Sequence, residues 1–242
     1  RERAILRRLI DAANDISTTA YNPEGRKPRE VLDHAEQLVF SISESDGNKR
    51  DGFQSMNTLV ARSLDRIEDL DKSGSAITGI STGFSRLDDK TSGLQKGDLA
   101  IVAARPSMGK TSWVLNVAQT AAIEHNIPVA IFSLEMGKEQ LVQRLLCAEG
   151  RVDSQRLRRG QLSADEYQRL AAAAGHLNTA PLWIDDSPGA TILEMRAKAR
   201  RLKAETEMGM LVIDYMQLMS GHGRSESRVQ EVSEISRGLK AL

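Results

Sequence analysis

The segment LAIVAARPSMGKTSW, residues 99–113, carries residue types that can hold the phosphates of a nucleotide. A phosphate-binding loop follows a strand, presents backbone N–H groups in a tight turn, and leads into a helix through a lysine and a hydroxyl residue. Lys110 supplies the ammonium for the β and γ phosphates, and Thr111 supplies the hydroxyl for Mg²⁺. We therefore expect nucleotide binding by Ala104, Arg105, Pro106, Ser107, Met108, Gly109, Lys110, Thr111 and Ser112.

One position departs from the usual pattern, because Ala104 stands where such a loop has its first glycine. Alanine adds only a methyl group and still reaches most conformations with φ below zero. Gly109, next to the lysine, is the position where phosphate must approach the backbone, and it is present. Ala104 therefore weakens the pattern without breaking it.

Three carboxylates follow apolar runs and are candidates for nucleotide hydrolysis. Hydrolysis needs one carboxylate that holds Mg²⁺ through water and another that orients or deprotonates the attacking water. Asp214 ends the run MLVID and Asp185 ends LWID, so both are candidates for the magnesium role. Glu135 ends the run AIFSLE and is the candidate for activating water. Ligands in open α/β sheets bind at the carboxyl ends of strands, where all three are expected to lie.

The elements that must position these residues follow an α/β pattern from about residue 76. Four continuously apolar runs predict strands buried on both faces of a parallel sheet, at 99–104, 128–133, 181–186 and 210–215. Helical segments separate the runs, and two of them open on a capping box, Ser163 with Glu166 and Thr191 with Glu194. This order predicts a mainly parallel sheet with helices on both faces.

The first 75 residues are helical in pattern. Residues 1–17 and 28–43 have helical periodicity, and 44–52 are polar and predict a linker. The next segment places six apolar residues on one helical stripe: Met56, Leu59, Val60, Leu64, Ile67 and Leu70. We expect this stripe to dock on a neighbouring domain or on another subunit.

Composition narrows the classes of protein. The formal charge is zero, with 33 Lys+Arg and 33 Asp+Glu, so the chain lacks the basic balance of proteins that coat nucleic acid. No apolar run is long enough to cross a bilayer, and the single cysteine, Cys147, fits a reducing cytoplasm and is expected to be a small buried residue. The histidines lack metal-ligand spacing, so no structural zinc is expected.

Two clusters of basic residues are candidate nucleic-acid contacts, although a solvated helix face is the more common origin of such clusters. The first contains Arg156, Arg158 and Arg159, and the second contains Arg196, Lys198, Arg200, Arg201 and Lys203.

The strings AARPSMGKTSW, IFSLEM and VIDYMQLM, together with TGISTGFSRLDDKTSGLQKGDL before them, resemble the bacterial replicative DNA helicases of the DnaB type. That family commonly has alanine at the first loop position. The resemblance implies a RecA-like P-loop NTPase core at 76–242, a linker with a docking helix at 46–75, and a remnant of an N-terminal helical domain at 1–45. It also assigns Asp214, rather than Asp185, as the carboxylate that holds Mg²⁺. Lys110 and Thr111 are assigned as the contacts to phosphate and magnesium, and Glu135 as the residue that activates water.

The resemblance further implies ATP and Mg²⁺ as cofactors and a homohexameric ring. The ring would move 5′ to 3′ on single-stranded DNA and unwind the duplex at the replication fork. Primase and a helicase loader are the implied partners, and the implied location is the cytoplasm, without a membrane. The resemblance assigns no role to Asp185, Asp186 or Gln217. The chain begins without Met and ends inside a helical pattern, so we expect a fragment that lacks the arginine finger and hydrolyses ATP weakly. Two alternatives stay open: a RecA-like ATPase that binds DNA without unwinding it, and a nucleotide-switched interaction module.

Overall fold

The computed structural model describes residues 2–23, 25, 28, 31–32, 34–35, 38–39, 42, 55–73, 77–219 and 228–240. The chain divides into two compact units, Arg1–Ser73 and Gly74–Leu242. Among the described residues, no helix is both long and apolar enough to span a membrane.

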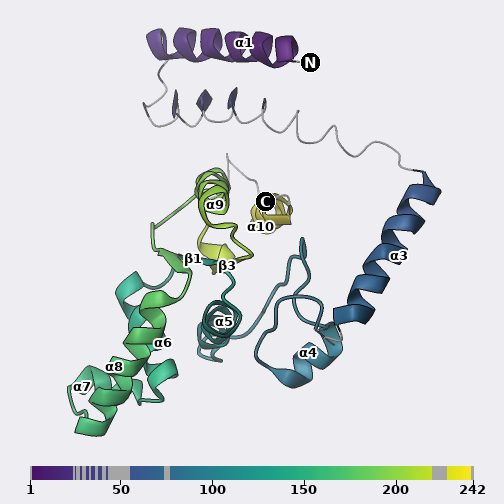
Figure 1. Cartoon of the computed structure of the whole chain (residues 1–242). Helices are drawn as coiled ribbons and strands as arrows, with labels where there is room; N and C mark the ends of the chain where they lie inside the picture. The colour runs from purple at the N-terminus through teal and green to yellow at the C-terminus, as the bar shows by residue number, and fades with distance from the viewer. Residues whose placement is uncertain are drawn as a thin grey trace. The chain divides into compact units, whose positions relative to one another are not determined.

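The first unit contains the helices α1 (Glu2–Tyr21) and α3 (Met56–Ser73) (Figure 1). Both agree with the helical periodicity of the sequence, whereas most of the helix predicted at 28–43 and the linker at 44–52 lie outside the described residues. On the stripe of α3, Met56 is 73%, Leu64 is 60% and Ile67 is 61% exposed. These three side chains are therefore not buried within the described part of the first unit.

The second unit is built on a parallel sheet of β1 (Val129–Ser133), β2 (Leu182–Asp185) and β3 (Met210–Asp214), in the order β2-β1-β3. Three of the four predicted strands are confirmed by it. Phe132 is level with Asp185, and Ser133 is level with Asp214. The ends of β2 and β3 therefore lie at one edge of the sheet, where the predicted site residues are expected.

The strand predicted at 99–104 is wrong for this structure. Residues 99–105 have neither strand nor helix, and Leu99, Ile101 and Val102 are 38%, 61% and 40% exposed. A buried strand needs a neighbouring strand that satisfies the hydrogen bonds of its backbone. Among the described residues, β3 pairs only with β1 and not with residues 99–104. The apolar run therefore stays outside the sheet.

Helices cover both faces of the sheet. The capping boxes predicted at Ser163 and Thr191 are both present, at the starts of α8 and α9. The short helices α4 and α7 were not expected from the sequence. The helical elements of this unit are α4 (Ser85–Thr91), α5 (Lys110–Gln119), the π-helix η2 (Thr120–Glu124), α6 (Lys138–Gly150), α7 (Ser154–Arg159), α8 (Ala164–Thr179), α9 (Ile192–Thr206), the 3-10 helix η3 (Met216–Leu218) and α10 (Arg228–Lys240).

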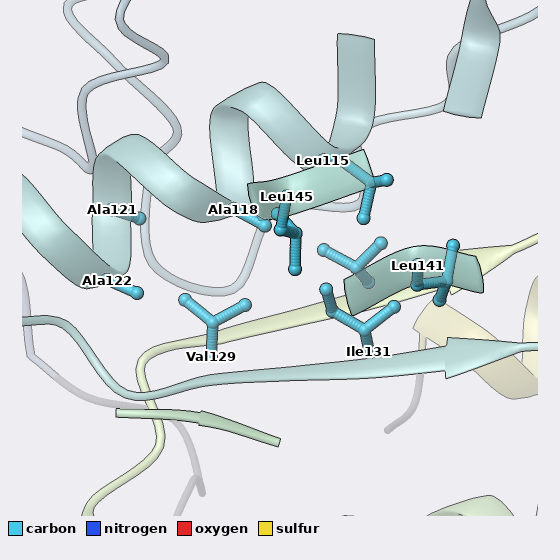
Figure 2. Close-up of a cluster of buried hydrophobic side chains, with 9 residues drawn as sticks. Leu115, Ala118, Ala121, Ala122, Val129, Ile131, Leu141 and Leu145 are labelled. Carbon is cyan, nitrogen blue, oxygen red and sulfur yellow. The ribbon is translucent and has the colours of Figure 1, made fainter. Parts of the chain in front are cut away.

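Two apolar clusters lie on opposite faces of the sheet because side chains alternate along a strand. Val129 and Ile131 of β1 point toward α5 and α6, where they meet Leu115 and Leu141 (Figure 2). Phe132, the next residue, packs into the other cluster with residues of α9 and α10, including Met195 and Ile235. Burial of each large side chain contributes about 1.5 to 3 kcal/mol. The expected arrangement of helices on both faces is therefore present.

Both basic clusters contain residues that form ion pairs on helices. Arg156 pairs with Glu166 at 2.7 Å, Lys198 with Asp185 at 2.6 Å, and Arg201 with Glu205 at 3.1 Å. Cys147 is buried as expected, and burial, followed by the charge of Asp153, raises the pKa of its thiol.

A buried carboxylate organises the segment that precedes the phosphate loop. Asp88 of α4 is 3% exposed and accepts hydrogen bonds from the hydroxyls of Ser81 and Thr82, each at 2.7 Å, and from the Thr82 N–H at 3.0 Å. Burial raises the pKa of Asp88, but these hydrogen bonds outweigh it and hold the pKa below its ordinary value. The same turn brings Phe84 onto Trp113 of α5, with ring centroids 5.8 Å apart. Asp88 thereby fixes the turn that packs against α5, the helix that carries Lys110 and Thr111.

We expect Asp88→Asn to lower the free energy of unfolding by about 2 kcal/mol at neutral pH, because an amide replaces the buried acceptor of several hydrogen bonds. The folded pKa is lowered, so the contribution of Asp88 is full above the unfolded pKa of about 3.9 and is lost as pH falls through the folded value. Urea denaturation at neutral pH and at a series of lower pH values measures the free energy of unfolding. Asp89→Asn, at the exposed neighbouring position, is the control, and an equal loss in both variants would contradict the prediction.

Candidate functional site

The turn before α5 has the backbone of a phosphate cradle. Ser107 and Gly109 have positive φ values of 65° and 83°, and Gly109 is the N-cap of α5. A side chain at position 109 would meet open space, but its backbone conformation is one that residues with a Cβ rarely adopt. The N–H groups of Lys110, Thr111 and Ser112 begin a helix and have no intrahelical acceptor. Glycine, open space and the N–H groups of a helix start together fit a phosphate.

Ala104 takes its expected conformation, since it does not adopt a positive φ. The alanine is therefore compatible with the backbone at this position. Ala104, Arg105, Pro106 and Met108 are all exposed, and the Met108 N–H donates to the Arg105 carbonyl at 3.3 Å.

Asp214 joins the end of β3 to the start of α5. It is 4% exposed, and its Oδ2 accepts a hydrogen bond from the Thr111 hydroxyl at 2.7 Å. The Nζ of Lys110 lies 3.9 Å from Oδ1 of the same carboxylate. A hydroxyl and a carboxylate side by side are oxygen ligands of the kind that Mg²⁺ prefers. The residues present therefore fit a magnesium-bound phosphate.

The second candidate for the magnesium role, Asp185, faces other partners. Its Oδ2 lies 2.6 Å from the Nζ of Lys198 on α9, and its Oδ1 accepts from the Ser187 N–H at 2.8 Å. Burial raises the pKa of Asp185, but the hydrogen bonds from Lys198 and Ser187 more than offset it, so the pKa is lowered. Its neighbour Asp186 accepts from the Lys138 N–H at the start of α6. Both carboxylates hold helices rather than the phosphate turn.

Glu135 lies two residues beyond β1 and is exposed. The Leu134 N–H donates to the Asp214 carbonyl at 2.7 Å, and the Ser133 hydroxyl donates to the Met136 carbonyl at 2.7 Å. These bonds fix the backbone on both sides of Glu135 next to Asp214. The side chain is thus available at the same edge of the sheet as the metal-ligand candidates.

One residue of the site was not predicted from the sequence. Tyr215 follows Asp214, and the Nζ of Lys110 lies 3.9 Å from the centroid of its ring. The sequence VIDYMQLM shows that Tyr215 is next to Asp214, but it does not show which group the tyrosine ring contacts. Gln217 lies in η3 and is exposed, with no role assigned to it by the geometry. Residues 220–227, which separate η3 from α10, lie outside the described residues.

A family model described as the DnaB-like helicase C-terminal domain matches residues 79–242. Among curated proteins, the replicative DNA helicase DnaC of Bacillus subtilis is 47% identical over 242 residues, and the replicative DNA helicase DnaB of Geobacillus stearothermophilus is 48% identical over 243 residues. Each alignment covers 100% of this chain and 53% of the relative. The chain therefore spans about half the length of these relatives.

Two solved structures have the same fold. One is described as an ATPase domain, and the chain matches it with a TM-score of 0.72 and 30% identity, over 78% of this chain and 67% of the other. The other is a DnaB-like replicative helicase, described with its interactions with primase. The chain matches it with a TM-score of 0.69 and 27% identity, over 99% of this chain and 55% of the other.

The two strand-end aspartates give a matched test of the metal site. We expect Asp214→Asn to weaken Mg²⁺-dependent binding of a fluorescent ATP analogue by roughly 10-fold or more, because it removes the charge beside Thr111 and Lys110. The identical change at Asp185 should leave the dissociation constant within about twofold, since Asp185 faces Lys198. Titrations of the full-length protein with Mg²⁺ and with EDTA measure both. A larger loss in Asp185→Asn would show that the metal site has been assigned to the wrong strand.

Proposed function

The chain belongs to the DnaB-like helicase family, and from this premise we propose that the protein is an ATP-driven replicative DNA helicase. The observation that carries the proposal is the meeting of Lys110, Thr111 and Asp214 at the turn before α5. The family match and the curated relatives support the same reaction.

In the proposed site, the N–H groups at the start of α5 and the Lys110 ammonium bind the phosphates of ATP. Thr111 and Asp214 would hold Mg²⁺, Asp214 through water. When bound, Mg²⁺ neutralises charge on the phosphate oxygens. These residues position the nucleotide, which is most of what phosphoryl transfer to water requires of a protein.

Glu135 is proposed to orient and deprotonate the attacking water. The support is its position: the backbone bonds of Ser133 and Leu134 hold it at the strand edge beside Asp214, and its carboxylate is exposed. An exposed carboxylate at this edge can accept a proton from water. Lys110 is the second proposed catalytic residue, through its charge on the phosphates.

The assembly and partners are proposed from the family. The protein would form a homohexameric ring that moves 5′ to 3′ on single-stranded DNA, with primase and a helicase loader as partners, in the cytoplasm. The exposed stripe of α3 supports docking on a second copy. One structural relative is described together with primase. The zero net charge fits contacts with DNA that are confined to part of the ring.

Strand displacement separates this proposal from a RecA-like ATPase that binds DNA without unwinding it. Dependence on Glu135 separates it from a nucleotide-switched interaction module, in which hydrolysis is incidental. The first comparison uses a forked duplex with one labelled strand, and the second uses the variant below.

We expect Glu135→Gln to reduce DNA-stimulated ATP turnover by roughly 100-fold or more while nucleotide binding is retained, because the amide positions water but accepts no proton. Steady-state phosphate release by the full-length protein, with and without single-stranded DNA, measures this. Glu139→Gln, an exposed glutamate in the first turn of α6, is the matched control and should be near wild type. Turnover indifferent to DNA and to Glu135 would leave a nucleotide switch in place of a motor.

A further inference from the structure

The ammonium of Lys110 is held by two groups from consecutive residues. Nζ lies 3.9 Å from Asp214 Oδ1 and 3.9 Å from the centre of the Tyr215 ring. The lysine side chain is only 25% exposed. A cation over the face of an aromatic ring is attracted by the ring quadrupole, and the attraction grows when water is excluded. The Tyr215 ring is therefore a second binding partner for the lysine beside the carboxylate of Asp214.

We propose that Tyr215 is a positioning residue that holds the Lys110 ammonium while no phosphate is bound and releases it when nucleotide enters. The inference rests on the proposed function, in which Lys110 binds the phosphates of ATP. A phosphate chain carries several negative charges and attracts an ammonium more strongly than a neutral ring does. Nucleotide must therefore break the contact between Lys110 and Tyr215.

The local structure keeps the ring where the lysine needs it. Two consecutive residues of α5 face the last residue of β3 and the residue after it. Thr111 donates to Asp214 at 2.7 Å, and Lys110 lies over Tyr215. The Tyr215 carbonyl accepts from the Leu218 N–H at 3.1 Å, which ties the residue to the turn of η3. Tyr215 and Lys110 are both half-buried, so water is partly excluded from their contact.

This contact acts against nucleotide binding, since its energy is lost when Lys110 moves to phosphate. Removal of the ring by Tyr215→Leu is therefore expected to tighten nucleotide binding by about 3- to 10-fold. Tyr215→Phe keeps the ring face and should bind nucleotide like the wild type. Because Lys110 is proposed to bind the phosphates and not Mg²⁺, the gain should be equal with and without Mg²⁺.

The test is equilibrium titration of the full-length protein and its Tyr215→Leu and Tyr215→Phe variants with a fluorescent ATP analogue, in Mg²⁺ and in EDTA. The same leucine substitution is made in a Lys110→Met background, where no cation remains to be held and its effect should vanish. Thermal denaturation of each variant confirms that the fold is retained.

Tighter binding in Tyr215→Leu in both buffers, with Tyr215→Phe unchanged and no effect without Lys110, supports the proposal. Unchanged or weaker binding, a gain confined to Mg²⁺, or a gain that persists in the Lys110→Met background overturns it, because the ring would then act through Asp214 or the general fold. Absence of any nucleotide binding by the wild type would instead overturn the proposed function, and this inference with it.

Discussion

The hydrogen bond from Thr111 to Asp214 joins two parts of the chain that are 103 residues apart in sequence. It connects the first turn of α5 to the last residue of β3, so the phosphate turn and the sheet share one fixed point. The register of the sheet then determines the rest of the site. Because Ser133 is level with Asp214, β1 ends beside it and delivers Glu135 to the same edge. A shift of one residue between β1 and β3 would move Asp214 away from the end of β1 and turn the side chains of one strand to the opposite face of the sheet.

The end of α5 is supported by close packing of the turn at residues 81–84. The turn at residues 81–84 is held by the buried carboxylate of Asp88, and Gly83 approaches the π-helix so closely that an added Cβ would lie 2.6 Å from the Thr120 hydroxyl. Only glycine suits this approach, since Gly83 also has a φ of 78°. The helix with the phosphate-binding residues is therefore supported at its beginning by β3 and at its end by the segment that precedes the loop.

The sequence was most informative where a structural element requires a particular type of residue. Gly109, Lys110 and Thr111 predicted the phosphate turn, and apolar runs predicted β1, β2 and β3, because a strand buried on both faces needs continuous apolar residues. The run at 99–104 has the same composition but no partner in the described sheet, and composition does not report pairing. Asp214 and Asp185 were indistinguishable from the residues alone, since the difference is made by Lys198, which α9 brings to Asp185. The contact of Tyr215 with Lys110 likewise depends on tertiary geometry.

The stack of Phe84 on Trp113 gives this chain a built-in optical probe. The chain has two tryptophans, Trp113 in the phosphate-loop helix and Trp183 in β2, an edge strand of the described sheet. Indole emission depends on the ring's immediate surroundings, and Trp113 shares its surroundings with the segment fixed by Asp88. Trp183 is 37% exposed and lies on the other side of β1 from β3, the strand that ends at Asp214. Motion of α5 relative to that segment would therefore alter the emission of Trp113, with Trp183 as an internal reference and no added label.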